Sequence, residues 1–307
     1  MGDILKRKSL KAVDNISFEI PENPAKIVTL AGESGSGKST IAKMLLMLEE
    51  PTSGEIMYKG KSLYKMSRRE TSGYRKNVQA IFQDPYSAYN PFYKVDRVLD
   101  MTIKQFNLAS NSEQKKEILL QTLDDVNLSP ERVLNKFPHQ LSGGERQRVM
   151  VSRALLTKPR LIICDEPISM VDASLSAGIL RLLLRLKEDY GASFLYITHD
   201  LSTAYQVSDE ILVLYRGSVV EKGGSEMLQN PLHPYLKDLI SSIPIPDPER
   251  RWKGELKIRT EELEYITGEQ GCKYYQRCAR RMEKCLTVTP ELLSQKANHH
   301  VACHLYT

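Results

Sequence analysis

The sequence has no long hydrophobic run and no secretion signal. No stretch of the 307 residues approaches the roughly 18 uncharged apolar residues that a membrane-spanning helix needs. Residues 1–11 contain no apolar segment like the core of a signal peptide. We therefore expect that the chain neither crosses a membrane nor is exported.

Charge of one sign is not in strong excess either. The formal net charge is +5, and the 43 Lys and Arg are scattered among 38 Asp and Glu. A nucleic-acid partner is therefore not indicated, because such proteins usually cluster basic residues on one face. With 41% hydrophobic residues, the chain can form one large α/β domain with an appendage, or two domains.

Residues 32–39, Gly-Glu-Ser-Gly-Ser-Gly-Lys-Ser, form a complete phosphate-binding P-loop motif. The apolar run 27–31 precedes it and a helix-forming stretch follows, which is the setting that the motif requires. Lys38 supplies charge for the β- and γ-phosphates and Ser39 offers its hydroxyl to Mg²⁺, whereas Glu33 is interpreted as a residue for loop shape or surface. The predicted nucleotide contacts are Gly32, Ser34, Gly35, Ser36, Gly37, Lys38, Ser39 and Thr40.

Apolar runs alternate with helical patterns along the chain. Runs at 27–31, 161–164 and 194–198 are typical of central strands in a parallel sheet, which puts functional residues at their carboxyl ends. Helical periodicity is found at 39–49, 113–126, 145–156 and 173–189, and residues 211–222 have the pattern of a hairpin.

Two adjacent carboxylates, Asp165 and Glu166, follow the apolar run 161–164. A strand that ends in this pair can present one carboxylate to Mg²⁺ through water and leave the next to polarise the attacking water. We assign Asp165 to Mg²⁺ and Glu166 to the general base. Cys164, inside the run, is interpreted as a small buried hydrophobe.

The segment 141–147, Leu-Ser-Gly-Gly-Glu-Arg-Gln, begins an expected helix with a Ser-Gly-Gly turn. Together with the P-loop it resembles the signature of the ATP-binding cassette (ABC) ATPases. The resemblance implies a P-loop, RecA-like ATPase core with an antiparallel β subdomain and a helical subdomain at about 84–158. It also implies that one subunit's signature completes the ATP site of a second subunit, here through Ser142, Gly143, Gly144 and Glu145.

Three further residues match cassette elements. Gln83 resembles the glutamine that contacts Mg²⁺ or water and senses the membrane subunits. His199 resembles the switch histidine that contacts the γ-phosphate and positions Glu166. Asp172 resembles an aspartate of the dimer interface, although Met-Val precedes it where the family usually has Ala-Leu. The resemblance thus implies catalytic roles for Gln83 and His199.

Aromatic residues are missing from positions 1–17. Cassette ATPases usually stack adenine on an aromatic side chain upstream of the P-loop, and Phe18 is expected to pack in the core. The adenine contact is therefore unassigned, and either base selectivity is loose or the partner subunit contributes.

Residues 80–91, AIFQDPYSAYNP, and 230–235, NPLHPY, resemble the oligopeptide and dipeptide importer ATPases, a family that includes nickel and some sugar importers. The resemblance implies that the chain is a peripheral ATPase at the cytoplasmic face of the membrane. Implied partners are a second, often different ATPase subunit, two permeases and an extracytoplasmic solute-binding protein. Candidate permease contacts after Gln83, with loop anchors as the alternative, are Tyr86, Tyr89 and Phe92.

Four of the five cysteines lie near the C-terminus, at Cys272, Cys278, Cys285 and Cys303. A chain without a secretion signal meets a reducing compartment, which disfavours disulfides. Four thiolates suit Zn²⁺ or an iron–sulfur cluster, and the short Cys-x2-Cys of common zinc ribbons is missing. The importer family has the same four-Cys pattern with a 4Fe–4S cluster, so the resemblance favours the cluster over Zn²⁺ or structural thiols.

The C-terminal segment carries basic side chains beside these cysteines. Arg277, Arg280 and Arg281 are expected either to balance the charge of a cluster or to form a solvated face. The histidines at 299, 300 and 304 are expected to be surface or supporting groups rather than ligands. A change of composition after Asn230-Pro231 predicts an ATPase domain at 1–230 and a Cys-rich extension at 231–307.

The sequence is best interpreted as the ATPase subunit of a peptide importer. Nickel and oligosaccharides remain open as cargo. A soluble non-transport cassette ATPase is the alternative from another class, and a structural metal-binding protein with a vestigial P-loop is the third.

Overall fold

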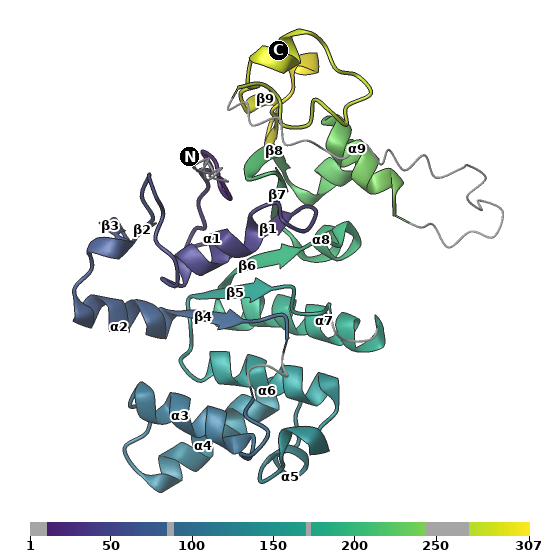
Figure 1. Cartoon of the computed structure of the whole chain (residues 1–307). Coiled ribbons are helices and arrows are strands. Elements are labelled where there is room, and N and C mark those ends of the chain that lie inside the picture. Colours follow the sequence, from purple (N-terminus) through teal and green to yellow (C-terminus); the bar gives the residue numbers. More distant parts are fainter. Residues whose placement is uncertain (1–10, 85–88, 170–172, 244–269) are drawn as a thin grey trace, which may run out of the picture.

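The computed structural model describes residues 11–84, 89–169, 173–243 and 270–307. Its main feature is an eight-stranded sheet in the order β4-β5-β6-β1-β7-β8-β10-β9 (Figure 1). The strands are β1 (Ile27–Ala31), β4 (Val78–Ile81), β5 (Leu161–Asp165), β6 (Ser193–Thr198), β7 (Glu210–Tyr215), β8 (Ser218–Gly223), β9 (Leu293–Lys296) and β10 (His299–Val301). The first five in the spatial order are parallel, and the last three are antiparallel to their neighbours.

The central strands are buried on both faces, as their continuous apolar sequences require. Alternate residues of β6 point to opposite sides: Phe194 and Tyr196 join one apolar cluster, and Leu195 and Ile197 join another. Cys164 is fully buried in β5, as predicted from its position in the run.

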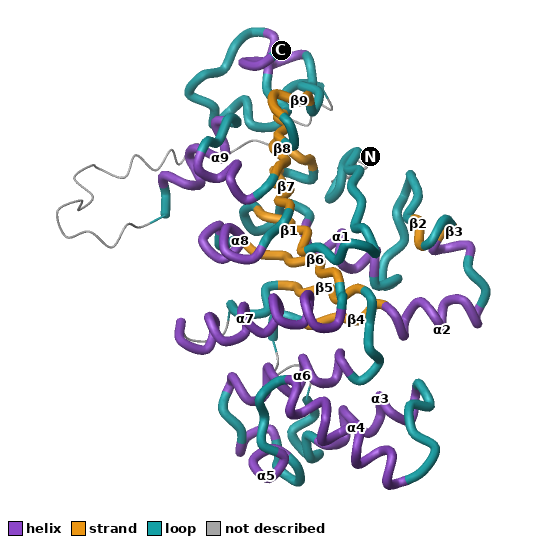
Figure 2. Tube along the Cα trace, turned by 180° about the vertical axis from the view of Figure 1, so that it is seen from behind, coloured by secondary structure: helices purple, strands orange, loops and turns teal. Residues whose placement is uncertain are grey.

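The helices are α1 (Lys38–Leu45), α2 (Arg68–Asn77), α3 (Asp96–Gln105), α4 (Ser112–Asp125), α5 (Pro130–Val133), α6 (Gly143–Leu155), α7 (Ala173–Tyr190), α8 (Leu201–Val207), α9 (Pro234–Ser241) and α10 (Lys284–Thr287). Helices α3 to α6 gather at one end of the molecule, and the C-terminal residues lie at the other (Figures 1 and 2). Hydrophobic residues of α6 and α7 share the larger apolar cluster, which ties the helical end to the sheet.

Local sequence signals explain where several helices begin. The side chain of Asn111 accepts a hydrogen bond from the N–H of Gln114 at the start of α4. Ser67 and Glu70 form a reciprocal capping box at the start of α2, and this arrangement satisfies N–H groups that the first turn leaves unpaired. The helix that follows the P-loop ends at Leu45, four residues before the predicted Glu49.

The expected antiparallel β subdomain is small within the described residues. It consists of β2 (Met57–Tyr58) paired with β3 (Lys61–Ser62). Phe18 lies outside the strands but packs against the apolar cluster that contains Leu30 and Ile197, so its predicted place in the core is confirmed.

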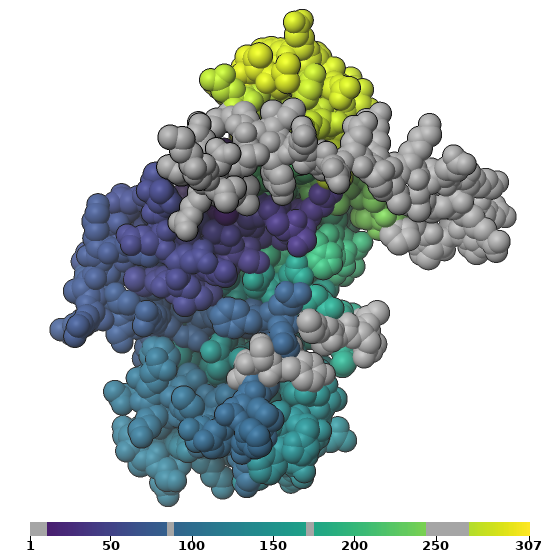
Figure 3. Space-filling view, in the orientation of Figure 1, coloured from purple at the N-terminus to yellow at the C-terminus, as the bar shows by residue number. Residues whose placement is uncertain are grey.

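The C-terminal segment is built into the main sheet. Strand β10 pairs with β8, so His299 and its neighbours extend the sheet past the β7–β8 hairpin. In the space-filling view the C-terminal part of the chain, drawn in yellow, forms one end of the surface, away from α3 and α4 (Figure 3). In the described part of the chain, no helix has both the length and the apolarity to cross a membrane.

Candidate functional site

Four neighbouring strands end at one edge of the sheet, and each leads into a predicted site residue. The P-loop follows β1, Gln83 follows β4, Glu166 follows β5 and His199 follows β6. Because the spatial order is β4-β5-β6-β1 and all four strands are parallel, their carboxyl ends lie side by side. The fold therefore brings together segments that are up to 167 positions apart, Gly32 of the P-loop and His199.

Glycines shape the loop between β1 and α1. Gly32 and Gly37 have φ values of 147° and 102°, which favour glycine. A Cβ on Gly32 would lie 2.3 Å from the carbonyl oxygen of Leu214, and one on Gly37 would lie 2.4 Å from that of Ala12. Side chains at these two positions would clash with the backbone that packs against the loop.

Lys38 lies at the start of α1 and is buried. Its Nζ donates to the carbonyl oxygens of Gly32 at 2.7 Å and Glu33 at 2.9 Å, and it lies 3.4 Å from Ser36 Oγ. Burial lowers the pKa of Lys38, and the carboxylates of Glu166, Asp165 and Glu33 oppose that shift. The loop thus holds a cation at the amino end of a helix, where phosphates bind well.

Asp165 lies beside the first turn of α1. Ser39 Oγ donates to Asp165 Oδ1 at 3.3 Å. Burial raises the pKa of Asp165, and the hydrogen bond from Ser39 works against this effect. Two hard oxygen donors are therefore close together, as a Mg²⁺ ion prefers.

The carboxylate of Glu166 bridges two other predicted residues. Oε1 lies 3.0 Å from His199 Nδ1, and Oε2 accepts from Gln83 Nε2 at 3.2 Å. The residue has a φ of 47°, an unfavourable value for a non-glycine residue, which functional sites often retain. Gln83 and His199 thus fix the direction of the carboxylate from opposite sides.

The predicted signature begins α6. Ser142 Oγ accepts from the Glu145 N–H at 3.2 Å, and Glu145 Oε2 accepts from the Ser142 N–H at 2.9 Å. The hydrogen bond from the Ser142 backbone is the main cause of the lowered pKa of Glu145. This capping box fixes the turn that presents Gly143 and Gly144.

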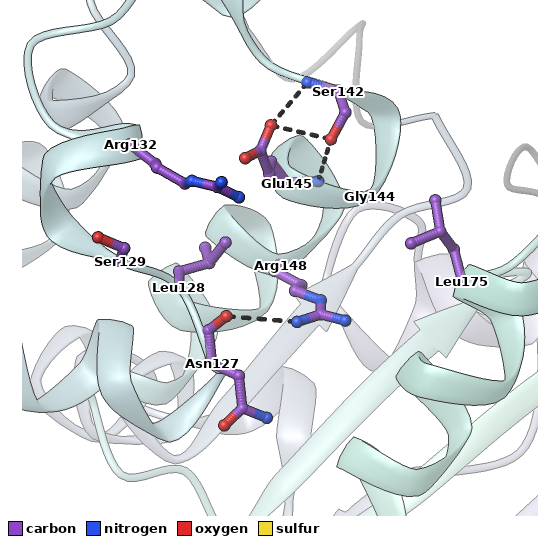
Figure 4. A pocket seen from close by; sticks show the side chains of 9 residues that line it. All are labelled: Asn127, Leu128, Ser129, Arg132, Ser142, Gly144, Glu145, Arg148 and Leu175. Atoms are coloured by element: carbon purple, nitrogen blue, oxygen red, sulfur yellow. Dashed lines mark hydrogen bonds between the residues drawn. The ribbon is translucent and has the colours of Figure 1, made fainter.

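A pocket of about 390 Å³ lies beside this turn (Figure 4). A Cβ on Gly144 would come within 2.9 Å of Leu175 Cδ1, so glycine permits the close approach of α6 and α7. The lining residues are Asn127, Leu128, Ser129, Arg132, Ser142, Gly144, Glu145, Arg148 and Leu175.

The four C-terminal cysteines lie near one another but do not form a recognisable metal site. Burial raises the pKa of Cys272 to about 11, and the charges of Cys278, Cys285 and Cys303 contribute in the same direction. Among the described residues, no three or more His, Cys, Asp or Glu side chains are arranged to hold a metal ion. The arrangement of these thiols therefore does not support the expected 4Fe–4S cluster or Zn²⁺.

The structure also bears on other expectations for the C-terminal segment. Arg277 makes a bidentate ion pair with Glu33 of the P-loop, a contact that neither of its two expected roles includes. Of the two roles expected for His299, surface or supporting, the structure shows the supporting one, because its Nε2 lies 2.7 Å from Oε1 of the fully buried Glu221. Nε2 of His304 donates to the Val288 carbonyl, so this histidine has a supporting role.

The candidate permease contacts that the structure describes differ in burial. Tyr89 is buried and donates to the carbonyl of Arg146 at 2.9 Å, so it is a loop anchor. Phe92 is 85% exposed and remains available at the surface. Tyr86 and the interface aspartate Asp172 lie outside the described residues.

The sequence analysis missed three side chains that contact the P-loop region. Tyr235 and Arg277 bind Glu33, and Lys273 pairs with Asp14 at 2.8 Å. No local spacing predicts these contacts, because the partners are more than 200 positions apart.

Comparisons with known proteins agree with the geometry. Residues 13–169 match the ABC transporter family, and residues 220–285 match the oligopeptide/dipeptide transporter C-terminal region. The Bacillus subtilis protein YkfD is 39% identical over 99% of this chain and 92% of its own length. The dipeptide transport ATP-binding protein DppF of Haemophilus influenzae is 35% identical over 98% of this chain and 91% of its own.

A solved structure shows the same fold. The ATP-binding cassette MJ0796, a dimer bound to ADP and Pi, superposes with a TM-score of 0.62. It is 30% identical, and the match covers 70% of this chain and 91% of MJ0796. This chain therefore belongs to the ABC transporter ATPase family, in the group that carries the oligopeptide/dipeptide transporter C-terminal region.

Proposed function

We propose that this chain is the ATP-hydrolysing subunit of an importer of dipeptides or oligopeptides. The observation that carries the proposal is the meeting of the P-loop, Glu166, Gln83 and His199 at one edge of the sheet. A phosphate-binding loop beside an oriented carboxylate suits the attack of water on a phosphoryl group. The substrate class comes from the relatives, among them DppF of Haemophilus influenzae.

In the proposed reaction, Lys38 and the P-loop N–H groups bind the β- and γ-phosphates of ATP. Glu166 accepts a proton from water as the water oxygen bonds to the γ-phosphorus and the bond to the leaving ADP oxygen breaks. Gln83 and His199 orient the carboxylate. Mg²⁺, held by Ser39, Gln83 and, through water, Asp165, would offset negative charge on the phosphates.

The signature is proposed to serve a second ATPase subunit. Ser142, Gly143, Gly144 and Glu145 form the amino end of α6, where N–H groups and the helix dipole favour an anion. The dimeric state of MJ0796 supports this arrangement. Asp172 would lie at the same interface, and the second subunit would be a different chain.

The remaining partners are two permeases and an extracytoplasmic solute-binding protein, with this chain bound at the cytoplasmic face of the membrane. The exposed ring of Phe92, nine residues after Gln83, suits a permease contact. We propose residues 1–230 as the ATPase domain and 231–307 as the extension. Nickel or oligosaccharide import is the alternative within the class, and a soluble cassette ATPase is the alternative outside it.

The 4Fe–4S cluster stays a proposal that rests on the chemistry of the donors. Cys272, Cys278, Cys285 and Cys303 offer four soft ligands, which would bind the cluster, or Zn²⁺ as the alternative. We assign the cluster no part in hydrolysis.

Reconstitution tests the proposed function. The chain would be purified with its permeases, placed in vesicles and supplied with peptide-loaded binding protein. We expect peptide uptake that requires ATP and ATP hydrolysis that the loaded binding protein stimulates. Failure to co-purify with any integral membrane protein would favour a soluble cassette ATPase, and uptake of nickel or oligosaccharide alone would change the substrate class.

A further inference from the structure

Glu33, the second residue of the P-loop, makes contacts through its carbonyl oxygen, its N–H and its carboxylate. Its carbonyl oxygen accepts from Lys38 Nζ at 2.9 Å. Its N–H donates to Tyr235 Oη at 2.9 Å. Its carboxylate accepts from Arg277 Nη1 at 2.9 Å and Nη2 at 3.1 Å. A side chain expected only to shape the loop therefore connects the phosphate-binding lysine to the C-terminal segment.

The paired side chains are placed for charge compensation rather than for stability. Glu33 and Arg277 are each 41% exposed, and an ion pair this exposed contributes little to global folding. The carboxylate, however, lies in the loop that must receive a triphosphate, and it is close enough to influence Lys38. Without Arg277, its negative charge would oppose the phosphates.

The guanidinium of Arg277 lies against two aromatic rings. Its Cζ lies 5.7 Å from the ring centre of Tyr274 and 5.9 Å from that of Tyr215. Tyr235 packs against both of these rings, so the same aromatic group that holds Arg277 also supplies the hydroxyl that binds the Glu33 N–H.

A second route connects the same segment to the loop. Lys273 Nζ donates to the Arg216 carbonyl at 2.9 Å and to Ser218 Oγ at 2.7 Å. Between these residues, the N–H of Gly217 donates to the carbonyl of Ser36 in the P-loop at 2.9 Å. Residues 273–277 thus contact the loop directly and through the β7–β8 turn.

We propose that Arg277 is a positioning residue for nucleotide binding. It neutralises Glu33 and fixes the part of the P-loop whose carbonyl binds Lys38, so that the C-terminal segment sets the affinity for ATP. Cys272 and Cys278 bracket residues 273–277, and Cys278 is one residue from Arg277, which contacts the P-loop. The inference rests on ATP binding at the P-loop, as proposed above.

A double-mutant cycle on the full chain tests the inference. Arg277→Gln should raise the Kd and KM for Mg-ATP roughly fivefold, the size expected for an exposed ion pair, and leave kcat unchanged. Glu33→Gln should raise the Kd less than Arg277→Gln does, because it removes the carboxylate that would oppose the phosphates. The double variant should bind ATP better than Arg277→Gln alone, because it removes the uncompensated carboxylate. Arg277→Lys, which keeps the charge, should recover most of the affinity.

Arg280→Gln is the matched control, since it removes a positive charge from an exposed position three residues after Arg277. An equal effect of Arg280→Gln, or a double variant no better than Arg277→Gln, would overturn the inference. So would a fall in kcat at constant KM, or a Kd for ATP that Arg277→Gln leaves unchanged. If the wild-type chain binds no ATP, the proposed function fails first, which separates the two results.

Discussion

The nucleotide loop and the C-terminal segment are built in opposite ways, although they touch. The loop is specified by consecutive residues, since Gly32, Gly37 and Lys38 all belong to one short motif. The C-terminal segment reaches it through Tyr235 and Arg277, which are 202 and 244 positions from Glu33. A local motif can be recognised in a sequence, whereas contacts made by the final packing cannot.

The two regions also differ in how charge is handled. Around the loop, burial lowers the pKa of Lys38 and raises that of Asp165, so both charged forms are disfavoured there. In the C-terminal segment, Arg277 is half-exposed and its pKa is raised, mainly by its hydrogen bonds to Glu33. We therefore expect variants in the loop to change chemistry strongly and variants in the segment to change it mildly.

The largest effect should come from Glu166→Gln. The amide cannot accept a proton from water, so ATP hydrolysis should fall roughly 10²- to 10⁴-fold, the usual effect of losing a general base. Binding should survive because the contacts of Lys38 and Ser39 remain. Steady-state hydrolysis and Kd for Mg-ATP would be measured together, with Lys38→Ala as the contrast that weakens binding itself. Near-normal turnover would exclude Glu166 as the base.

Substitution of the C-terminal cysteines should have little effect on ATP hydrolysis. If they bind a 4Fe–4S cluster, anaerobically purified protein should be brown and contain iron and sulfide in equal amounts. Cys303→Ser, Cys285→Ser and their counterparts at 272 and 278 should each remove the colour and the iron. ATP binding by the Cys303 variant should persist. A colourless protein with one zinc per chain would replace the cluster assignment with a zinc site. A protein free of both metals would leave the four cysteines as structural thiols.

A third, smaller effect concerns the stability of the protein at low pH, where His233 is the titrating group. His233 is 1% exposed, and burial lowers its pKa to about 4 from the ordinary value of 6.5. The folded chain therefore binds fewer protons than the unfolded chain between these pH values. This contribution to the free energy of unfolding is complete above pH 6.5 and is lost as pH falls toward 4.

His233→Asn tests this effect. Asparagine can still accept the hydrogen bond that Tyr235 N–H gives to His233 Nδ1, but it does not titrate. Denaturant unfolding between pH 7 and 4.5 should show a shallower loss of stability in the variant, by about 2–3 kcal/mol over the full range. Parallel pH profiles for the two proteins would contradict the assignment.

Much of the catalytic edge could be predicted from the sequence. The runs that became β1, β5 and β6 were recognisable because strands buried on both faces are continuously apolar. Helices α4 and α7 were also predicted to within a residue at each end, since apolar periodicity marks both and Asn111 caps the first turn of α4.

The sequence left roles open or missed them where tertiary packing decides. Tyr89 was a candidate permease contact with a loop anchor as the alternative, and the structure shows the anchor, because its hydroxyl donates to a carbonyl of α6 and its side chain is buried. His299 was expected as a surface or supporting group, and the choice between the two depends on β10, which adds to the sheet beside β8 and brings His299 to the buried Glu221. Arg277 was expected to balance a cluster or to form a solvated face, because nothing local points to Glu33. In each case the missing information was a partner distant in sequence.

The smallest effect we predict comes from Tyr235→Phe. The variant keeps the aromatic packing with Tyr215 and Tyr274 but removes the oxygen that accepts the Glu33 N–H. One hydrogen bond contributes about 0.5–1.5 kcal/mol, so the Kd for Mg-ATP should rise roughly two- to tenfold, toward the lower figure because water can replace the lost acceptor. Tyr274→Phe is the matched control, since it keeps the ring and loses only a bond to Asp238. Equal effects from the two variants would mean that the aromatic group acts on the loop through packing alone. A rise confined to Tyr235→Phe would show that a hydroxyl 202 positions away helps to hold the P-loop for ATP.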